Sequence, residues 1–310
     1  MNLVSEMRVA LIRKLTELME TEEDIVVLTG DLGFSFLEEI ESKFPERFYN
    51  VGIAEQALIG IAAGLAKEGK KVVVYSILPF LIYRPYEQIL LDVSYHELPV
   101  VLVSAGTGFS YGSDGVSHYG LADLSLMLPL PNMSVYSPAE ATETAQYIEE
   151  ALKANKPAYI RLGKTKNPSF QSKVESKDGL TILEDTGENI VFSTGDISLV
   201  VEKAIHQLKK EGILFSHIHI GRIKPLSNRI NAYLQNAHGI IVSIEEHQKL
   251  FGFGGFLSEQ LNKKIYTIGI NNIFEREFGE REYMLRNNGL DENGVTNYLK
   301  SLVRAKQDEK

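Results

Sequence analysis

The sequence predicts an α/β protein made of two doubly wound domains. Short apolar runs of strand length alternate with segments of helical periodicity, and this alternation is typical of parallel sheets covered by helices on both faces. The alternation stops over residues 164–188, which are polar and have no sustained period, and then it starts again. The length of 310 residues leaves room for about two domains.

The first half of the chain supplies strands and helices in turn. Residues 6–20 carry apolar side chains at helical spacing, and the apolar run 24–29 ends at a glycine, as a buried strand before a turn does. Ser137 is a suitable N-cap for a helix with Pro138 at its first position. The remaining elements are expected as helices at 54–68, 86–95 and 138–155, and as strands at 71–76, 99–104 and 157–162.

The second half repeats this rhythm on a smaller scale. Strands are expected at 190–193, 214–220, 239–244 and 264–268, and helices at 197–211 and 256–263. We therefore expect a first domain with a mainly parallel sheet over residues 1–165 and a second, smaller α/β domain over residues 189–304. Residues 166–188 are expected to link the two, with room for a short hairpin.

Composition excludes several classes of function. The chain has 32 Lys and Arg against 41 Asp and Glu, a net charge of −9, which argues against a nucleic-acid-binding face. The absence of cysteine excludes disulfides, thiolate catalysis and cysteine-ligated zinc. No apolar run approaches the ~20 residues of a membrane span, and the N-terminus lacks a signal-peptide core. We expect a cytoplasmic protein that binds neither nucleic acid nor membranes.

The stretch from Asn50 to Ala66 is the most informative part of the sequence. A short loop leads into a helix that is apolar nearly all round, which predicts burial, and Glu55 lies in its first turn. Gly60 and Gly64 leave one face of this helix free of side chains. Acidic residues are favourable at helix N-termini, so the pattern alone leaves both a structural and a functional role open for Glu55.

Six segments resemble, in order, parts of the transketolases, a family of thiamine diphosphate enzymes. The resemblance covers nearly the whole chain and implies a thiamine pyrimidine-binding domain followed by a transketolase-type C-terminal domain. The six segments are FPERFYNVGIAEQ (44–56), ILPFLIYRPYEQ (77–88), GSDGVSH (112–118), LPNMSVYSPAEATET (130–144), PAYIRLGK (157–164), and IKPL (223–226) with VSIEEH (242–247) before GFGG.

The resemblance implies thiamine diphosphate as cofactor and a catalytic role for Glu55. The cofactor's amino group takes up the thiazolium proton only when ring atom N1′ is protonated, so a carboxyl group must share a proton with N1′. Burial raises the pKa of a carboxyl group, which keeps that proton available. Phe80 and Tyr83 match aromatic positions around the pyrimidine ring, with core packing as the other explanation. Arg84 matches an arginine of split transketolases, and Ile77 replaces a third aromatic residue.

The resemblance also implies substrate contacts. His118 is expected to hydrogen-bond a ketose donor near its carbonyl group, and Asp114 to contact a hydroxyl group of the acceptor. Arginine suits bidentate anion recognition, although interface ion pairs explain arginines equally well. We therefore expect a sugar phosphate or another anionic sugar. Four positions match the family's sugar-phosphate contacts: Arg8, Ser35, Arg161 and Gly106. At Gly106 the family has a histidine.

One part of the family pattern is missing from this chain. The diphosphate-binding domain of transketolases carries a Gly-Asp-Gly…Asn motif that holds Mg²⁺ or Ca²⁺, and no Gly-Asp-Gly occurs here. The resemblance thus implies the C-terminal subunit of a split transketolase, with an N-terminal subunit as partner in an α2β2 assembly. The partner is expected to hold most of the diphosphate and the metal ion. His217 and His219, which share one face of a predicted strand, are only a weak sign of a metal site.

The function implied is the transfer of a two-carbon ketol unit from a ketose to an aldose. Two other thiamine enzymes stay open. The segment RPYEQ (84–88) is similar to deoxyxylulose-phosphate synthases, and the β-type subunits of 2-oxo-acid dehydrogenases share the helix that carries Glu55. The segment DGVSH (114–118) favours ketose handling. A non-enzymatic scaffold subunit is disfavoured because Glu55, Asp114 and His118 are all present.

Overall fold

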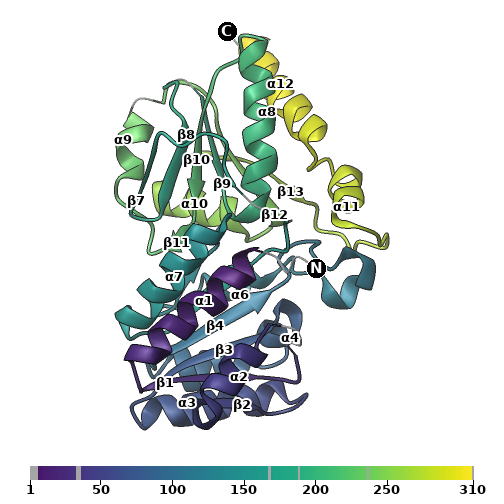
Figure 1. Ribbon diagram of the computed structural model, residues 1–310. Coiled ribbons are helices and arrows are strands. Elements are labelled where there is room, and N and C mark those ends of the chain that lie inside the picture. The colour runs from purple at the N-terminus through teal and green to yellow at the C-terminus, as the bar shows by residue number, and fades with distance from the viewer. Residues whose placement is uncertain (1–5, 33–35, 167–168, 188, 236, 309–310) are drawn as a thin grey trace.

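Two α/β sheets organise the structure, a computed structural model that describes residues 6–32, 36–166, 169–187, 189–235 and 237–308. The first half of the chain, purple to teal, forms the lower part of the molecule in Figure 1, and the second half, green to yellow, forms the upper part. Both sheets are mostly parallel and flanked by helices, so the predicted fold class is confirmed.

The first sheet has seven strands in the order β11-β5-β6-β4-β3-β1-β2. The pairs from β5 to β2 are parallel, whereas β11 pairs antiparallel with β5. The chain adds β2 on one side of β1 and β3 on the other, so its winding direction reverses there. Open α/β sheets bind ligands at such a reversal, outside the carboxyl ends of the strands. The strands are β1 (Ile25–Thr29), β2 (Phe48–Asn50), β3 (Lys71–Ile77), β4 (Val100–Ala105), β5 (Ser134–Tyr136), β6 (Ala158–Leu162) and β11 (Arg222–Lys224).

Helices cover both faces of this sheet because alternate strand residues point to opposite sides. Val27 and Val73 pack with the layer of α1, whereas Val26 and Val72 pack with the layer of α3. The pattern of continuous apolar strands in the sequence follows from this burial on both faces. The helices are α1 (Glu6–Thr21), α2 (Glu38–Lys43), α3 (Glu55–Lys67), α4 (Leu78–Tyr83), α5 (Tyr86–Gln88), the π-helical turn η2 (Ile89–Ser94), α6 (Asp123–Met127) and α7 (Ala141–Ala154).

The second sheet has six strands in the order β13-β12-β9-β10-β8-β7. Four of them are parallel, and the hairpin of β8 and β7 adds an antiparallel edge beside β10. The strands are β7 (Glu175–Lys177), β8 (Leu180–Glu184), β9 (Asn189–Ser193), β10 (Phe215–Ile220), β12 (Ile241–Gln248) and β13 (Tyr266–Ile270). The helices are α8 (Ser198–Lys210), α9 (Ile230–Gln235), α10 (Phe253–Leu261), α11 (Arg281–Asn287) and α12 (Glu292–Asp308).

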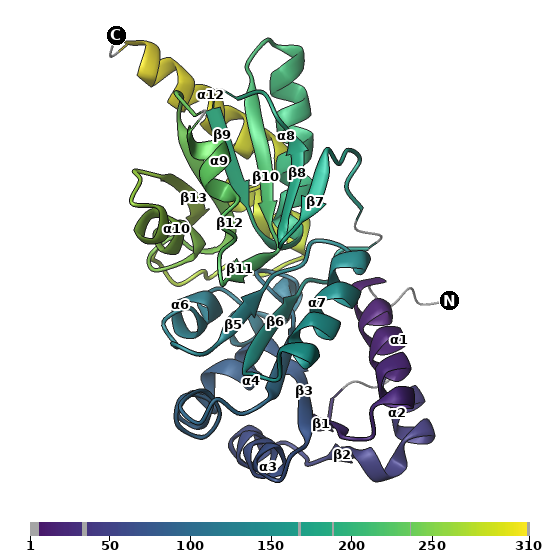
Figure 2. The same cartoon turned by 90° about the vertical axis from the view of Figure 1, so that its left-hand side faces the viewer.

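Two features of the sheets tie the halves of the chain together. Residues 166–188, expected as a linker, supply β7 and β8 to the second sheet. Strand β11 leaves the second half of the chain and joins the first sheet, and Figure 2 shows it at the junction of the two domains. No helix in the described ranges is both long and apolar enough to pass through a membrane.

The start of α7 differs from the expectation. The predicted cap at Ser137 with Pro138 as the first helical residue is wrong, since the helix begins at Ala141. The backbone of Ser137 is used by the second domain instead: its N–H donates to the Gly221 carbonyl at 2.7 Å, and its carbonyl accepts from the Gly195 N–H at 3.1 Å. These bonds hold the residue outside the helix.

Candidate active site

Seven side chains gather beyond the carboxyl ends of the first sheet's strands. Glu55 begins α3 after β2, Phe80 and Arg84 follow β3, Tyr111 and His118 follow β4, and Lys164 follows β6. Arg8, from the start of α1, completes the group. Ring, ion-pair and hydrogen-bond contacts join them in one row, which we call the site cluster: Glu55, Arg84, Phe80, His118, Tyr111, Arg8 and Lys164.

Glu55 forms the first end of the site cluster. It opens α3 as the helix's first residue, and its side chain is only 7% exposed. The Arg84 Nη1 atom donates to its Oε1 atom at 2.7 Å. Arg84 itself is held over the ring of Phe80, with its guanidinium carbon 4.2 Å from the ring centroid. The carboxylate is therefore buried, paired with a cation on one side and fixed at a helix N-terminus.

Aromatic rings form the middle of the site cluster. The ring of His118 meets that of Phe80 edge to face, with centroids 5.1 Å apart, and lies 6.1 Å from the ring of Tyr111. The Nδ1 atom of His118 is 3.0 Å from the Ser117 hydroxyl oxygen. These contacts orient the imidazole and leave Nε2 as the nitrogen directed to other groups.

Two cations form the other end. The Nη2 atom of Arg8 donates to the Tyr111 hydroxyl group at 3.0 Å, and the Lys164 ammonium lies 3.9 Å from the centroid of the Tyr111 ring. Partial burial and the charge of Arg8 lower the pKa of Lys164, while Asp114 and Glu280 raise it. The Nε atom of Arg8 is buried without a partner among the described residues. An anion placed here would meet two positive charges and an unsatisfied donor.

Arg161 is not part of this cationic end, contrary to its expected contact with a sugar phosphate. The residue is 3% exposed. Its Nε and Nη2 atoms donate to the Asp123 carboxylate at 2.8 and 3.2 Å, and its Nη1 atom donates to the Ser137 hydroxyl group at 3.4 Å. A guanidinium group held in this way has no face left for a substrate. Lys164, three residues further along, is instead the cation that lies with Arg8 beside Tyr111.

Two family models account for most of the chain. The pyrimidine-binding domain of transketolase matches residues 5–169, and the C-terminal domain of transketolase matches residues 180–276. The chain belongs to the transketolase family. The resemblance found in the sequence is thereby confirmed, with both of the family's domains in the expected order.

This chain matches some transketolase-family relatives over almost their whole length and others over about half of it. A protein of Methanocaldococcus jannaschii named for a transketolase C-terminal section is 33% identical, over 89% of this chain and 90% of that protein. An apulose-4-phosphate transketolase subunit of Phocaeicola vulgatus is 28% identical, over 91% and 92%. The 1-deoxy-D-xylulose-5-phosphate synthase of Thermotoga maritima is 29% identical, but the match spans only 49% of its length.

Solved transketolase structures share the fold. A split gene transketolase, described as an inactive β4 tetramer, is 30% identical and covers 96% of this chain with a TM-score of 0.83. A transketolase of Pichia stipitis in complex with sedoheptulose-7-phosphate covers 97% of this chain with a TM-score of 0.82 at 20% identity, which compares folds alone. The match spans 46% of that longer chain.

Four further positions are named from the family resemblance: Tyr83, Asp114, Gly106 and Ser35. Tyr83 follows Phe80 by one helical turn on α4, and its hydroxyl group accepts from the Ala122 N–H at 3.1 Å. Asp114 is exposed on the short helix Gly112–Asp114 and acts electrostatically on Lys164. Gly106, where the family has a histidine, has a φ of +97° and the Tyr111 ring beside it. Ser35 lies outside the described residues.

Three histidines of the second domain, His217, His219 and His247, are fully buried and have partners within the protein. His219 lies 3.1 Å from a carboxylate oxygen of Glu143 and contacts Ser198, and His217 contacts Ser193. His247 accepts from the Leu124 N–H at 3.2 Å through Nε2. No group of three or more metal-ligating His, Asp or Glu side chains occurs in the described part of the chain.

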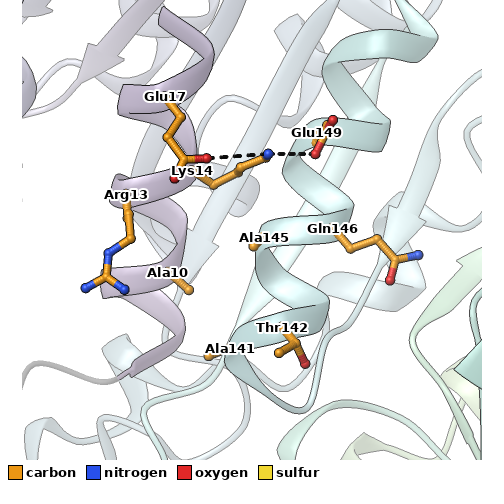
Figure 3. A pocket seen from close by; sticks show the side chains of 9 residues that line it. All are labelled: Ala10, Arg13, Lys14, Glu17, Ala141, Thr142, Ala145, Gln146 and Glu149. Carbon is orange, nitrogen blue, oxygen red and sulfur yellow. Dashed lines mark ion pairs between the residues drawn. The ribbon is translucent and has the colours of Figure 1, made fainter. Parts of the chain in front are cut away.

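A groove on the surface between α1 and α7 is a separate feature (Figure 3). Ala10, Ala141 and Ala145 let the two helices approach closely there. Lys14 crosses the groove, with its ammonium 2.8 Å from Glu149 and 3.5 Å from Glu17. No residue of the site cluster is among the described residues that line it, and the Lys14–Glu149 ion pair already spans it, so we assign it no ligand.

Three buried groups, His217, His247 and Glu245, make a combined contribution to stability that is expected to be greatest near pH 6.5. Burial lowers the pKa of His217 to about 3 and of His247 to about 4, and it raises the pKa of Glu245 to about 8. Below the ordinary histidine pKa of 6.5, these two histidines bind protons in the unfolded chain but stay neutral in the folded chain. The free energy of unfolding therefore falls as the pH falls. From 4.5 to 8 the folded chain keeps the Glu245 proton that the unfolded chain releases, so this contribution falls as the pH rises.

Urea unfolding between pH 4.5 and 9 measures this dependence, with Glu245→Gln as the matched variant. We expect the decline between pH 6.5 and 8 to flatten in Glu245→Gln, while the decline toward acid pH stays. An alkaline decline of unchanged slope in the variant would show that the proton on Glu245 is not its source.

Proposed function

We propose that the chain is the C-terminal subunit of a thiamine diphosphate-dependent transketolase, which transfers a two-carbon ketol unit from a ketose to an aldose. The observation that carries this proposal is the site cluster. It joins a buried acid at one end to two cations at the other through Arg84, the rings of Phe80 and Tyr111, and His118 between those rings. Such an order suits a cofactor ring beside Glu55 and an anionic sugar, such as a sugar phosphate, beside Arg8 and Lys164.

The residues present fit the cofactor's pyrimidine end. Thiamine diphosphate, when bound, supplies an acidic thiazolium carbon that adds to carbonyl groups. Glu55 is a buried carboxylate whose one hydrogen-bond partner in the described chain is the side chain of Arg84, so a further proton at its free oxygen can be shared with ring atom N1′. Phe80, and Tyr83 one turn later on α4, offer aromatic surface for a stacked ring.

The other residues of the site cluster serve the substrate. His118 is held by Ser117 at Nδ1, so we assign its Nε2 atom to a carbonyl or hydroxyl oxygen of the ketose. Asp114 is assigned to a hydroxyl group of the acceptor. Arg8 and Lys164 bind the anionic end, and Lys164 takes the role that the sequence prediction gave to Arg161.

A partner subunit completes this proposal. We assign Mg²⁺ or Ca²⁺ and most diphosphate contacts to an N-terminal transketolase subunit in an α2β2 assembly. The relatives named as a transketolase subunit and as a C-terminal section support a split arrangement, and so does the β4 tetramer described as inactive. An apolar face of α3 is open for such contacts. Ile61 on this helix is 43% exposed, and Ile53 just before it is 76% exposed. No described atom lies within 4 Å of a side chain built at Gly60 or Gly64.

The decisive experiment compares the purified chain with its complex. We expect ketol transfer from a ketose phosphate to an aldose phosphate by the complex, and neither activity nor tight cofactor binding by the chain alone. Isothermal titration with thiamine diphosphate and Mg²⁺ tests the binding. Tight, magnesium-dependent binding by the isolated chain would overturn the partner assignment.

A second candidate is a deoxyxylulose-phosphate synthase-like reaction. It is favoured by relatives with that name that match 95% of this chain at 29% identity. Its donor is a 2-oxo acid that loses carbon dioxide. Release of carbon dioxide from pyruvate by the complex, without use of ketose donors, would select this candidate or the 2-oxo-acid dehydrogenase type over ketol transfer.

Lys164→Met tests the anionic end. We expect the KM for a phosphorylated aldose to rise by about 10- to 100-fold, the loss of one hydrogen bond to a charged group, with a much smaller change for an unphosphorylated aldose. Lys166→Met is the matched control, because Lys166 is an exposed lysine two residues away. Equal effects of Lys164→Met on both aldoses would remove Lys164 from phosphate binding.

A further inference from the structure

Arg281, the first residue of α11 in the second domain, binds two buried acids, Glu246 and Asp196. Its Nη2 and Nε atoms donate to the Glu246 carboxylate at 2.5 and 3.1 Å, and its Nη2 atom lies 3.5 Å from Asp196. Its Nη1 atom donates to the Thr165 hydroxyl group at 3.3 Å. The side chain is 14% exposed. One guanidinium group thus joins three segments that are distant in the sequence.

Glu246 connects Arg281 to the base of the loop that carries Tyr111 and His118. It accepts from the Phe109 N–H at 2.7 Å. A side chain built at Gly108 would come within 2.3 Å of the Glu246 carboxyl carbon, and Gly108 has a φ of +59°. Glycine is therefore required here so that the acid can reach the loop backbone.

Asp196 connects Arg281 to the segment that carries Lys164. The Thr165 hydroxyl group donates to Asp196 Oδ2, and a side chain built at Gly163 would come within 2.2 Å of the same oxygen. Lys164 lies between these two residues in the sequence, so the same acid packs against the chain before Lys164 and hydrogen-bonds to it after Lys164. The contacts at Gly163 and at Gly108 have the same form, an acid of the second domain packed against a glycine of the first.

We propose that Arg281 is a positioning residue for the anionic end of the site: through Glu246 and Asp196 it sets where Lys164 stands relative to Arg8 and Tyr111. This inference rests on the proposed function for its substrate, an anionic sugar. It assigns the second domain a part in substrate selectivity, although that domain contributes no residue to the site cluster.

Arginine suits this task better than lysine. Its planar fork can engage Glu246 with two atoms while a third nitrogen reaches Thr165. Removal of the whole side chain would leave two buried carboxylates without their cation, which is strongly destabilising. Variants that keep the charge, or that cut only the link to Lys164, are therefore the informative ones.

The test uses the assembled complex with Arg281→Lys and Thr165→Val. Thr165→Val removes the hydroxyl group that Asp196 and Arg281 share, while the ion pair of Arg281 with Glu246 stays. Arg222→Lys is the matched control, since Arg222 also comes from the second half of the chain and pairs with Glu150 of α7 at 2.5 Å, with a side chain 21% exposed. Two readouts apply: KM for phosphorylated and unphosphorylated aldoses, and the pH profile of Lys164 acetylation by acetic anhydride, followed by peptide mass spectrometry.

In both Thr165→Val and Arg281→Lys, we expect the KM for the phosphorylated aldose to rise relative to the KM for the unphosphorylated aldose, by up to about tenfold. That change corresponds to one weakened hydrogen bond to a charged group. We expect kcat to change little. We also expect the acetylation midpoint of Lys164 to move toward the ordinary lysine pKa as the ammonium group becomes less buried and moves away from Arg8. Arg222→Lys should change neither the KM ratio nor the acetylation midpoint of Lys164.

The acetylation profile does not depend on turnover, so it separates this inference from the proposed function. A shifted Lys164 profile in a complex that transfers no ketol unit would keep Arg281 as a positioning residue and reject the transferase. An unshifted profile and an unchanged KM ratio in folded Thr165→Val would overturn the inference even if ketol transfer is confirmed.

Discussion

Glu55→Gln in the assembled complex is expected to slow hydrogen–deuterium exchange at the thiazolium carbon of added thiamine diphosphate by ~10²–10⁴-fold, the usual contribution of a positioned acid–base group. An amide is nearly isosteric with the carboxyl group and can still accept from Arg84, so the fold should stay intact. It cannot hold the proton that ring atom N1′ needs. Exchange at this carbon, followed by NMR after acid quench, reports the step without any substrate.

A charge at a helix N-terminus also stabilises the helix, so a control must separate the two effects. Glu292 begins α12 as Glu55 begins α3, but it is exposed and belongs to the second domain. Glu292→Gln should leave the exchange rate unchanged. If Glu55→Gln in the complex exchanged as fast as the unsubstituted chain, Glu55 would have only its structural role.

The fold could be predicted because both sheets have strands buried on two faces. Strands such as β3 and β4 appear in the sequence as mostly apolar runs, and helical segments lie between them. The edge strands carried no such signal. β7 is fully exposed, and β11 has three residues whose partner, β5, lies more than eighty residues earlier. Pairing of this kind depends on tertiary contacts that no local pattern records.

The site could be predicted in part for a similar reason. Glu55, Phe80 and His118 each stand in a segment whose local pattern and family resemblance mark them. The sequence prediction named Arg161 and not Lys164, and which of the two reaches the site depends on where β6 ends. The strand stops at Leu162, so Arg161 stays within the buried sheet and Lys164 emerges beyond it. Arg281, more than a hundred residues after Thr165, had no signal in the sequence at all.

His118→Ala is expected to lower ketol transfer by the complex by ~10²–10⁴-fold while the affinity for thiamine diphosphate stays nearly unchanged. The imidazole lies between the rings of Phe80 and Tyr111, away from Glu55 at the end of the row. It should therefore act on the oxygens of the ketose, where charge and protons shift as the carbon–carbon bond breaks. Single-turnover cleavage of a ketose donor, followed by quench and product analysis, measures that step apart from product release.

Two further variants make the result specific. His238→Ala removes an exposed histidine of the second domain and should leave cleavage unchanged. Ser117→Ala removes the partner at Nδ1 and should reduce cleavage less than His118→Ala does, because the rings of Phe80 and Tyr111 still hold the imidazole. If His118→Ala cleaved ketose donors at the full rate, the loop 112–118 would not handle the ketose, and the 2-oxo-acid reaction would become the better explanation of the same buried acid.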